Sequence, residues 1–190
     1  MTRQEEQNDI LLDCTTRFDE LGIDYMLTGS MALVHYAIPR STADIDIVLD
    51  IHPGHVDRFV SRFENDYLVD RGRVQEAVYA RRLFNVLHQE VIIKVDCVVR
   101  KDDEYSRNAF SNRRRVQYTR EFSIWIVSKE DLVLSKLNWA KESRSEFQMR
   151  DVTSILMNSF DEDYIRLWAK RLGTEDMFDE CLARTGDHYA

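Results

Sequence analysis

The chain has 190 residues, of which 44% are hydrophobic and 32% are charged, and its formal net charge is −8. The length fits one globular domain, alone or with a helical appendage, and the presence of only 2 Pro and 6 Gly excludes a collagen-like or Pro-rich disordered chain. The acidic net charge argues against nucleic-acid binding over a broad surface, although a local basic patch would still contact RNA.

The sequence also predicts a cytoplasmic protein with no membrane partner. Its apolar runs are far shorter than the roughly 20 residues of a membrane-spanning helix. The N-terminal residues MTRQEEQND have no apolar core of the kind that signal peptides need. Three scattered cysteines without metal-ligand spacing, Cys14, Cys97 and Cys181, are expected to be reduced thiols.

Hydrophobic periodicity predicts a region of strands and helices followed by helices alone. In chain order, the first region is expected to contain a helix over 8–21, a strand over 25–27, a helix over 30–37, a strand over 43–49, helices over 53–63 and 73–81, strands over 83–87 and 91–100, a helix over 103–110, and strands over 116–119 and 122–127. Helices are then expected over 128–141, 146–158, 161–172 and 175–183. The fold class is therefore α+β, with a mixed sheet and flanking helices over 1–127 and a C-terminal helical bundle over 128–190 that packs on them.

Two aspartates share one face of the strand predicted over 43–49. Residues two apart on a strand point the same way, so Asp44 and Asp46 are neighbours with Cα atoms roughly 6.6 Å apart. Two carboxylates this close repel each other unless a cation intervenes, and a hard divalent ion such as Mg²⁺ is their natural partner. The same pair is also typical of a solvated face on an edge strand.

A third acid interrupts the most apolar strand of the sequence. In the strand over 91–100, one face is wholly apolar, and the other carries Lys94 and Asp96. We expect this strand to lie beside the first acidic strand, and Asp96 then joins Asp44 and Asp46 around one metal site. The alternative is an exposed Asp96 that pairs with a nearby arginine.

Upstream, Thr28-Gly29-Ser30 is expected at a turn from strand to helix. A glycine allows a ligand to approach the backbone closely, and the start of a helix offers unpaired N–H groups and a partial positive charge that suit phosphate. Ser30 is equally suited to cap the helix, as serines commonly do.

These motifs together resemble the DNA polymerase β-type nucleotidyltransferase superfamily. The shared order is a strand, Gly29-Ser30, a helix, Asp44-x-Asp46 on the next strand, and Asp96 on a later one. A looser resemblance, to the AbiEii-type nucleotidyltransferases of toxin–antitoxin systems and their minimal relatives, rests on the residues around the acidic strand and on parts of the helical region. Those stretches are Arg40 to Ile47, Glu130 to Leu132, Ser135 to Leu137 and Arg150 to Val152.

The resemblance implies a Mg²⁺-dependent enzyme, with Mn²⁺ as an alternative metal, that transfers a nucleoside monophosphate from an NTP such as ATP to an acceptor hydroxyl. Asp44, Asp46 and Asp96 would be the catalytic and metal-binding residues. Gly29 and Ser30 would hold the triphosphate. Two cations roughly 3.5–4 Å apart would stabilise the charge that develops on the entering and leaving oxygens.

Further site residues are expected around this core. Lys136 and Asp151 each lie within the packing face of a predicted helix, where an unpaired charge is costly. Either they pair with each other or with neighbouring charges and hold the helices, or Lys136 binds the triphosphate and Asp151 orients it, as the resemblance implies. Arg40 either binds phosphate or braces the loop before the acidic strand, and Thr42 in that loop has a supporting role.

Three functions stay open at this point. The first is an active transferase acting on tRNA or protein, for which the basic cluster Arg113 to Arg115 near Arg120 would contact RNA unless it is simply solvent-exposed. The second is a transferase of aminoglycoside type, which modifies a small molecule. The third is an inactive domain that binds a nucleotide or a toxin or antitoxin partner, against which the intact acids argue.

Overall fold

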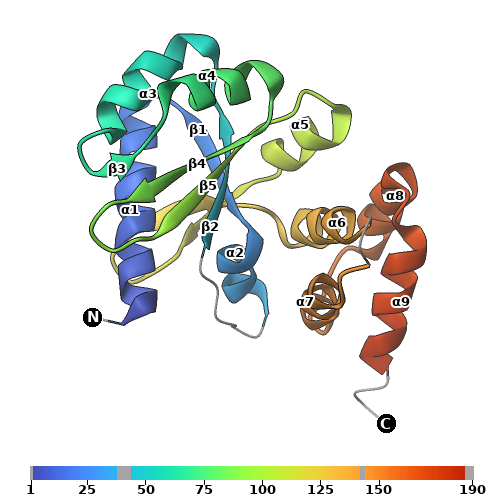
Figure 1. Ribbon diagram of the computed structural model, residues 1–190. Coiled ribbons are helices and arrows are strands. Elements are labelled where there is room, and N and C mark those ends of the chain that lie inside the picture. The colour runs from blue at the N-terminus through green and yellow to red at the C-terminus, as the bar shows by residue number, and fades with distance from the viewer. Residues whose placement is uncertain (1, 38–43, 142–143, 187–190) are drawn as a thin grey trace. The chain divides into compact units, whose positions relative to one another are not determined.

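The computed structural model describes residues 2–37, 44–141 and 144–186, and the chain divides into two compact units. The first unit covers the chain to Met31 and continues from the second strand to Ile126. The second unit begins at Val127 and also takes in the second helix from Ala32 onward. Figure 1 shows the helices and strands of both units, coloured from the N-terminus to the C-terminus.

The first unit contains all seven strands of the described chain. Its elements, including the start of α2, are α1 (Arg3–Leu21), β1 (Asp24–Thr28), α2 (Gly29–Tyr36), β2 (Asp44–Asp50), the short 3₁₀ helix η1 (Pro53–His55), α3 (Val56–Phe63), β3 (Tyr67–Leu68), α4 (Arg71–Ala80), β4 (Leu83–His88), β5 (Lys94–Val99), α5 (Glu104–Ser111), β6 (Arg114–Gln117) and β7 (Ser123–Ile126).

The strands form one mixed sheet in the order β3-β4-β5-β2-β1-β7-β6. The pairs β2–β5 and β1–β7 are parallel, and the other neighbours are antiparallel. Figure 1 shows β2 and β5 crossing the middle of this sheet. The predicted α+β class with a mixed sheet is therefore confirmed.

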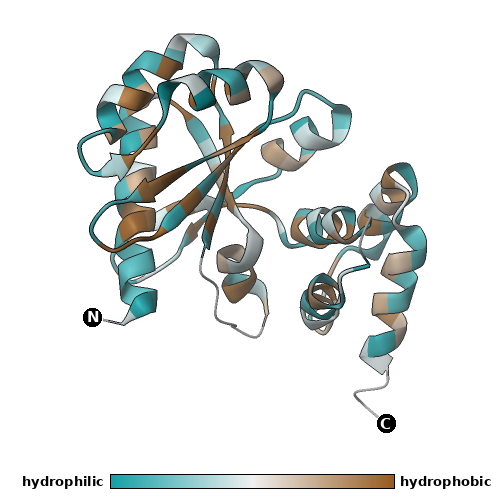
Figure 2. Cartoon of the chain, in the orientation of Figure 1, coloured by the Kyte–Doolittle hydropathy of each residue, from teal (hydrophilic) through white to brown (hydrophobic). Residues whose placement is uncertain are grey.

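One face of the sheet is the core of the first unit. Ile45, Ile47 and Leu49 of β2 are fully buried, and the alternate residues of β5 continue this apolar face. Phe59 of α3 stacks on Phe18 of α1 and meets Phe84 of β4 edge-on. Figure 2 shows the hydrophobic colour concentrated in the central strands. Because strand side chains alternate, burying this face leaves the polar side chains of β2 and β5 on the other.

The second unit adds four helices after β7, namely α6 (Lys129–Ala140), α7 (Glu146–Leu156), α8 (Glu162–Leu172) and α9 (Glu175–Gly186). Helix α6 packs against α7 and α8, and α9 packs against α7 and α8. Ser128 caps α6 by accepting the backbone N–H of Asp131, and the buried Asp131 carboxylate accepts hydrogen bonds from the hydroxyls of Ser128 and Tyr164. No helix in the described ranges is both long and apolar enough to span a bilayer.

Several element boundaries differ from the predicted ones. Helix α1 begins at Arg3 rather than residue 8, because Thr2 and Glu5 form a capping box there. Strand β5 begins at Lys94 rather than residue 91, since Ile92 has a positive φ of 52° that interrupts the extended backbone. The two-residue strand β3 was not predicted at all. Ser30 lies inside α2 instead of preceding it, because the helix begins at Gly29.

Candidate active site

The three predicted acids lie on the same half-exposed face of the sheet. Strands β2 and β5 are parallel neighbours, and their register places Asp46 beside Asp96 and Asp44 beside Lys94. The sequence prediction that these acids come from adjacent strands is therefore confirmed. Strand β2 lies between β1 and β5 rather than at an edge, so the edge-strand interpretation of Asp44 and Asp46 was wrong.

Gly29 packs directly against the Asp46 carboxylate. Its φ is +64°, and a Cβ atom added there would lie 2.0 Å from Asp46 Oδ2 and 2.8 Å from Asp46 Cβ. Thr28 is the register partner of Asp46 in β1. The first turn of α2 therefore begins beside this carboxylate, where the positive end of the helix dipole favours negative charge. Ser30, the next residue, is largely buried.

Lys94 joins the acids of the two strands. Its Nζ lies 2.9 Å from Asp96 Oδ2 and 3.4 Å from Asp44 Oδ2. The hydrogen bond to Asp96 raises the pKa of Lys94 above its usual value, with the nearby charge of Asp44 adding to the effect, so the lysine is a cation at neutral pH. Among the described residues, Asp96 therefore pairs with a lysine of its own strand and not with the arginine that the alternative interpretation expected.

Asp96 keeps one oxygen uncommitted. Its side chain is only 13% exposed, and within the described part of the chain its Oδ1 is buried with no hydrogen-bond partner. A buried carboxylate oxygen without a partner is costly, because it has lost its hydration. A bound cation or a hydrogen-bond donor would supply the partner that this oxygen lacks.

These residues fit a hard divalent ion. The three side chains offer carboxylate oxygens, which Mg²⁺ prefers, and Asp96 Oδ1 has no hydrogen-bond partner among the described residues. Gly29 lets the Asp46 carboxylate approach the start of α2 more closely than any side chain would allow. In residues 2–37, 44–141 and 144–186, no three acidic, histidine or cysteine side chains are already gathered as a metal cage. In this arrangement the cation between Asp44 and Asp96 is Lys94.

The structure adds Asn85 to this face, which the sequence analysis missed. Asn85 of β4 is the antiparallel register partner of Asp96, and its side chain is exposed. The signal was present in the alternation of the strand, because Phe84 and Val86 are buried and Asn85 therefore points to the face that Asp96 shares.

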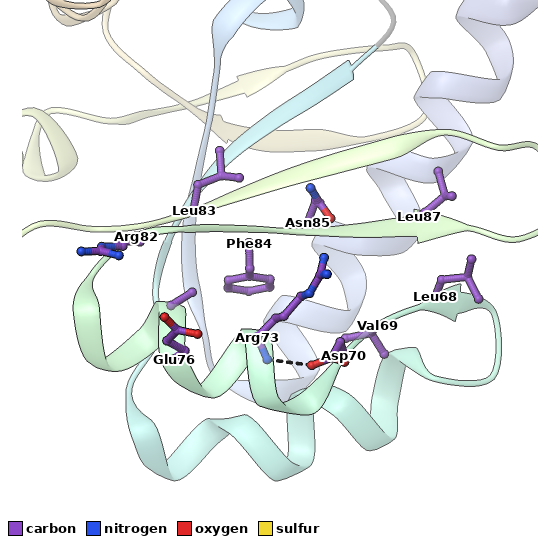
Figure 3. Close-up of a pocket in the computed structure, with 11 residues that line it drawn as sticks. Leu68, Val69, Asp70, Arg73, Glu76, Arg82, Leu83, Phe84, Asn85 and Leu87 are labelled. Carbon is purple, nitrogen blue, oxygen red and sulfur yellow. Dashed lines mark hydrogen bonds between the residues drawn. The ribbon is translucent and has the colours of Figure 1, made fainter.

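A separate cavity of about 610 Å³ lies beside β4 and α4 (Figure 3). Figure 3 shows Phe84 on the side of β4 that faces α4, with Leu83 and Asn85 on the opposite side. Arg73 and Glu76 of α4 supply charges to its lining, and the three acids of β2 and β5 take no part in it. The cavity therefore shares Asn85 with the acidic face but none of its three acids.

Comparison with known proteins identifies the family. The family model described as a nucleotidyltransferase of unknown function (DUF6036) matches residues 11–175. The chain belongs to this family. No curated protein matches it.

Solved structures share the fold of this DUF6036 nucleotidyltransferase. The antibiotic-resistance factor ANT(2'')-Ia is 11% identical, with 97% of each chain covered and a TM-score of 0.55. An antigenic nucleotidyltransferase-like protein from Paracoccidioides brasiliensis is 16% identical, with 75% of this chain and 72% of that chain covered and a TM-score of 0.52. TM1012 from Thermotoga maritima is 17% identical, with 79% and 94% covered and a TM-score of 0.50. At these identities the likeness establishes the nucleotidyltransferase fold alone.

The helical unit of the DUF6036 protein contains the predicted pair Lys136 and Asp151. Lys136 Nζ lies 2.7 Å from Asp151 Oδ2 and 3.1 Å from Gln148 Oε1, and the two charged side chains are only 4% and 7% exposed. The structure thus contains the ion pair of the first interpretation. Binding of the triphosphate by Lys136 stays a prediction.

The remaining predicted residues are Arg40, Thr42 and the basic cluster. Arg40 and Thr42 lie outside the described residues. Arg114 and Arg115 are exposed residues of strand β6. Arg113 is mostly buried, stacks over the rings of Phe110 and Trp125 and pairs with Asp24. The cluster therefore does not act as a single exposed basic patch.

Proposed function

We propose that this nucleotidyltransferase transfers a nucleoside monophosphate from an NTP to an acceptor hydroxyl with the help of Mg²⁺. The observation that carries the proposal is the parallel register of β2 and β5, which puts Asp46 beside Asp96 on one polar face while Gly29 packs on Asp46. Stability of the fold does not require three acids on one face, whereas phosphoryl transfer needs carboxylates that hold the ion.

Asp44, Asp46 and Asp96 would hold the ion, or Mn²⁺ in its place. When bound, the ion would supply positive charge to the triphosphate and to the oxygens that gain charge in the reaction. Gly29 and Ser30, in the first turn of α2, would bind phosphate oxygens, since the positive end of a helix dipole and its backbone N–H groups suit an anion.

Asp96 is the residue to which we assign the acceptor proton. The acceptor oxygen forms a bond to the α-phosphorus, the bond from that phosphorus to the bridging oxygen breaks, and pyrophosphate leaves with the electron pair. The acceptor proton passes to the Asp96 carboxylate, which contributes general-base catalysis. The uncommitted, buried Oδ1 supports this assignment, because protonation would satisfy it.

The acceptor class is an open part of the proposal, with three members. ANT(2'')-Ia, which shares the fold, is an antibiotic-resistance factor, and the net charge of −8 favours a cationic small molecule over RNA. Transfer to tRNA or protein, and a role beside a toxin or antitoxin partner, follow from the resemblance of the motifs. An inactive binding domain is disfavoured, since a domain without transfer has no need of three acids on one face.

The decisive experiment incubates the purified chain with Mg²⁺ and each α-labelled NTP in the presence of tRNA, cell-lysate protein or aminoglycosides. We expect label on one acceptor class, and at least about 100-fold less label with Asp46→Asn. Asp57→Asn is the matched control, because Asp57 is an exposed aspartate that pairs with Arg71 on the surface. Transfer that survives in Asp46→Asn, or NTP-dependent thermal stabilisation without any transfer, would overturn the proposal.

A further inference from the structure

The polar face of the sheet holds a cation of its own among the acids. Lys94 is the register partner of Asp44 and is two residues before Asp96 on β5, so its ammonium bridges the two strands. Three carboxylates would carry a charge of −3 in close proximity, and the ammonium reduces this to −2. Without it, the largely buried Asp96 would be a carboxylate with neither charge partner nor full hydration.

The ion pairs that Lys94 forms with the two acids are partly exposed to solvent. The Lys94 side chain is 39% exposed, and a lysine is a flexible point charge on a four-carbon stem that is able to turn into solvent at low cost. A lysine built only to brace the sheet would saturate the acid it holds, as a buried ion pair does. Here Asp96 Oδ1 is still without a partner among the residues that the structure describes.

We propose that Lys94 is the counter-cation of the metal-free site, and that a divalent ion displaces its ammonium from Asp96 and Asp44. This inference rests on the proposed function, because it takes the three acids as the metal ligands. Lys94 is thus a positioning residue. It keeps the carboxylates together without metal, and it sets how tightly the metal binds by competing for the same oxygens.

Charge fixes the sign of the expected effects. Replacing Lys94 with a neutral residue removes a positive charge from within a few ångströms of the ion, so divalent metal should bind more tightly. The same replacement leaves Asp44 and Asp96 to repel each other, so without metal the variant should melt at a lower temperature than the wild type. Added metal should then raise the melting temperature of the variant by more than it raises that of the wild type. A structural lysine would lower stability and leave metal affinity unchanged or weaker.

The test measures Mn²⁺ binding to the full-length chain without nucleotide, by electron paramagnetic resonance, for the wild type, Lys94→Met and Lys94→Arg. We expect Mn²⁺ affinity to rise on the order of tenfold in Lys94→Met and to stay close to wild type in Lys94→Arg, which keeps the charge. Lys101→Met, which removes an exposed lysine beyond the other end of β5, should leave the affinity unchanged.

A second measurement uses the wild type alone and decides the matter if Lys94→Met does not fold. Acylation of each lysine is followed by mass spectrometry with and without Mn²⁺, and the proposal expects Lys94 to react faster when Mn²⁺ is bound and its ammonium is released. Unchanged or slower acylation of Lys94 with Mn²⁺ bound would overturn the inference, as would equal or weaker Mn²⁺ binding in Lys94→Met. If the wild type binds no Mn²⁺, or Asp46→Asn binds it equally well, the metal site of the proposed function fails instead.

Discussion

Two lysine–aspartate pairs, one in each unit, have similar lengths and opposite surroundings. The Lys136–Asp151 pair of the helical unit spans 2.7 Å, has Gln148 as a further partner and is almost fully buried. The Lys94–Asp96 pair of the sheet spans 2.9 Å, is partly exposed and shares its lysine with Asp44. The first pair balances its own charge, whereas the second leaves an excess of negative charge. We infer that charge balance and burial, rather than the presence of an ion pair, distinguish a structural ion pair from a binding site.

The largest contrast is expected between Asp96→Asn and Asp151→Asn. Asp96→Asn should lower transfer by about 100- to 1,000-fold, because it removes a charged group that faces the reacting atoms, and it should change the free energy of unfolding by less than about 1 kcal/mol. Asp151→Asn should lower the free energy of unfolding by about 3 kcal/mol, because it leaves the Lys136 charge buried without a counter-ion. Urea unfolding and transfer assays on the folded proteins measure the two effects.

The expected difference between the two variants is contradicted if Asp151→Asn loses transfer activity and affinity for NTP while its free energy of unfolding is unchanged. That outcome would place the Lys136–Asp151 pair in the nucleotide site, as the resemblance of the motifs implies.

The second contrast compares the two lysines by stability in a chelator. Lys136→Met should lower the free energy of unfolding by about 3–5 kcal/mol, since Asp151 is then a buried, unpaired charge. Lys94→Met should lower it by about 1 kcal/mol or less, because a partly exposed ion pair is screened by solvent. The double variant Lys136→Met with Asp151→Leu should recover most of the loss, and a lack of recovery would show that the helices need the charges themselves.

Features of the fold and the site that depend on neighbouring residues in the sequence could be predicted, whereas those that depend on contacts between distant segments could not. Alternation within one strand is local, so the shared face of Asp44 and Asp46 and the polar side of β5 could be predicted from the residues. The pairing of β2 with β5 was expected from the shared chemistry of the three acids, because no local pattern specifies which strands become neighbours. Asn85 was missed for the same reason, since its importance comes from its register with Asp96 across a hairpin.

Backbone conformation explains the other differences. The left-handed conformation of Ile92 delays the start of β5 to Lys94, and the apolar composition of residues 91–93 gives no sign of it. The ion pair of Lys136 with Asp151 was one of two interpretations, because helical periodicity identifies the face on which a charge lies and not its partner. Lys94 was seen on the acidic face, but its bridge between two strands required the register of the sheet.

The third contrast uses two glycines that share a conformation. Gly22 and Gly29 have φ values of +68° and +64°, but a Cβ at Gly22 would meet no described atom within 4 Å, whereas at Gly29 it would collide with Asp46. Gly22→Ala should cost about 1 kcal/mol from backbone strain alone. Gly29→Ala should cost about 1–2 kcal/mol more, because turning the carboxylate away does not remove the clash with Asp46 Cβ, and it should also weaken Mn²⁺ binding.

Urea unfolding of the two glycine variants, with Mn²⁺ binding on the same samples, measures this difference. Equal costs and an unchanged Mn²⁺ affinity would mean that the approach of Gly29 to Asp46 has no part in shaping the site.

A last comparison separates the two units through their buried thiols. Burial raises the pKa of Cys14, in the sheet unit, to about 12 and that of Cys181, in the helical unit, to about 11. In the unfolded chain these thiols ionise near pH 9.0. Above that pH the unfolded state is stabilised by ionisation of the thiols, so the free energy of unfolding falls until the pH reaches the pKa of the folded state. Stability should therefore be level up to about pH 8 and fall between pH 9.0 and about 11 to 12.

Alkylation of the thiols at pH 8 reports local opening of each unit separately, because a protonated, buried thiol reacts only when its surroundings open. Mass spectrometry of the modified peptides gives one opening rate for Cys14 and another for Cys181. Lys136→Met should speed the labelling of Cys181 and leave that of Cys14 nearly unchanged, if each unit opens independently. Equal acceleration at both thiols would show that the two units unfold as one, and the buried pair of the helical unit would then stabilise the whole chain rather than its own unit.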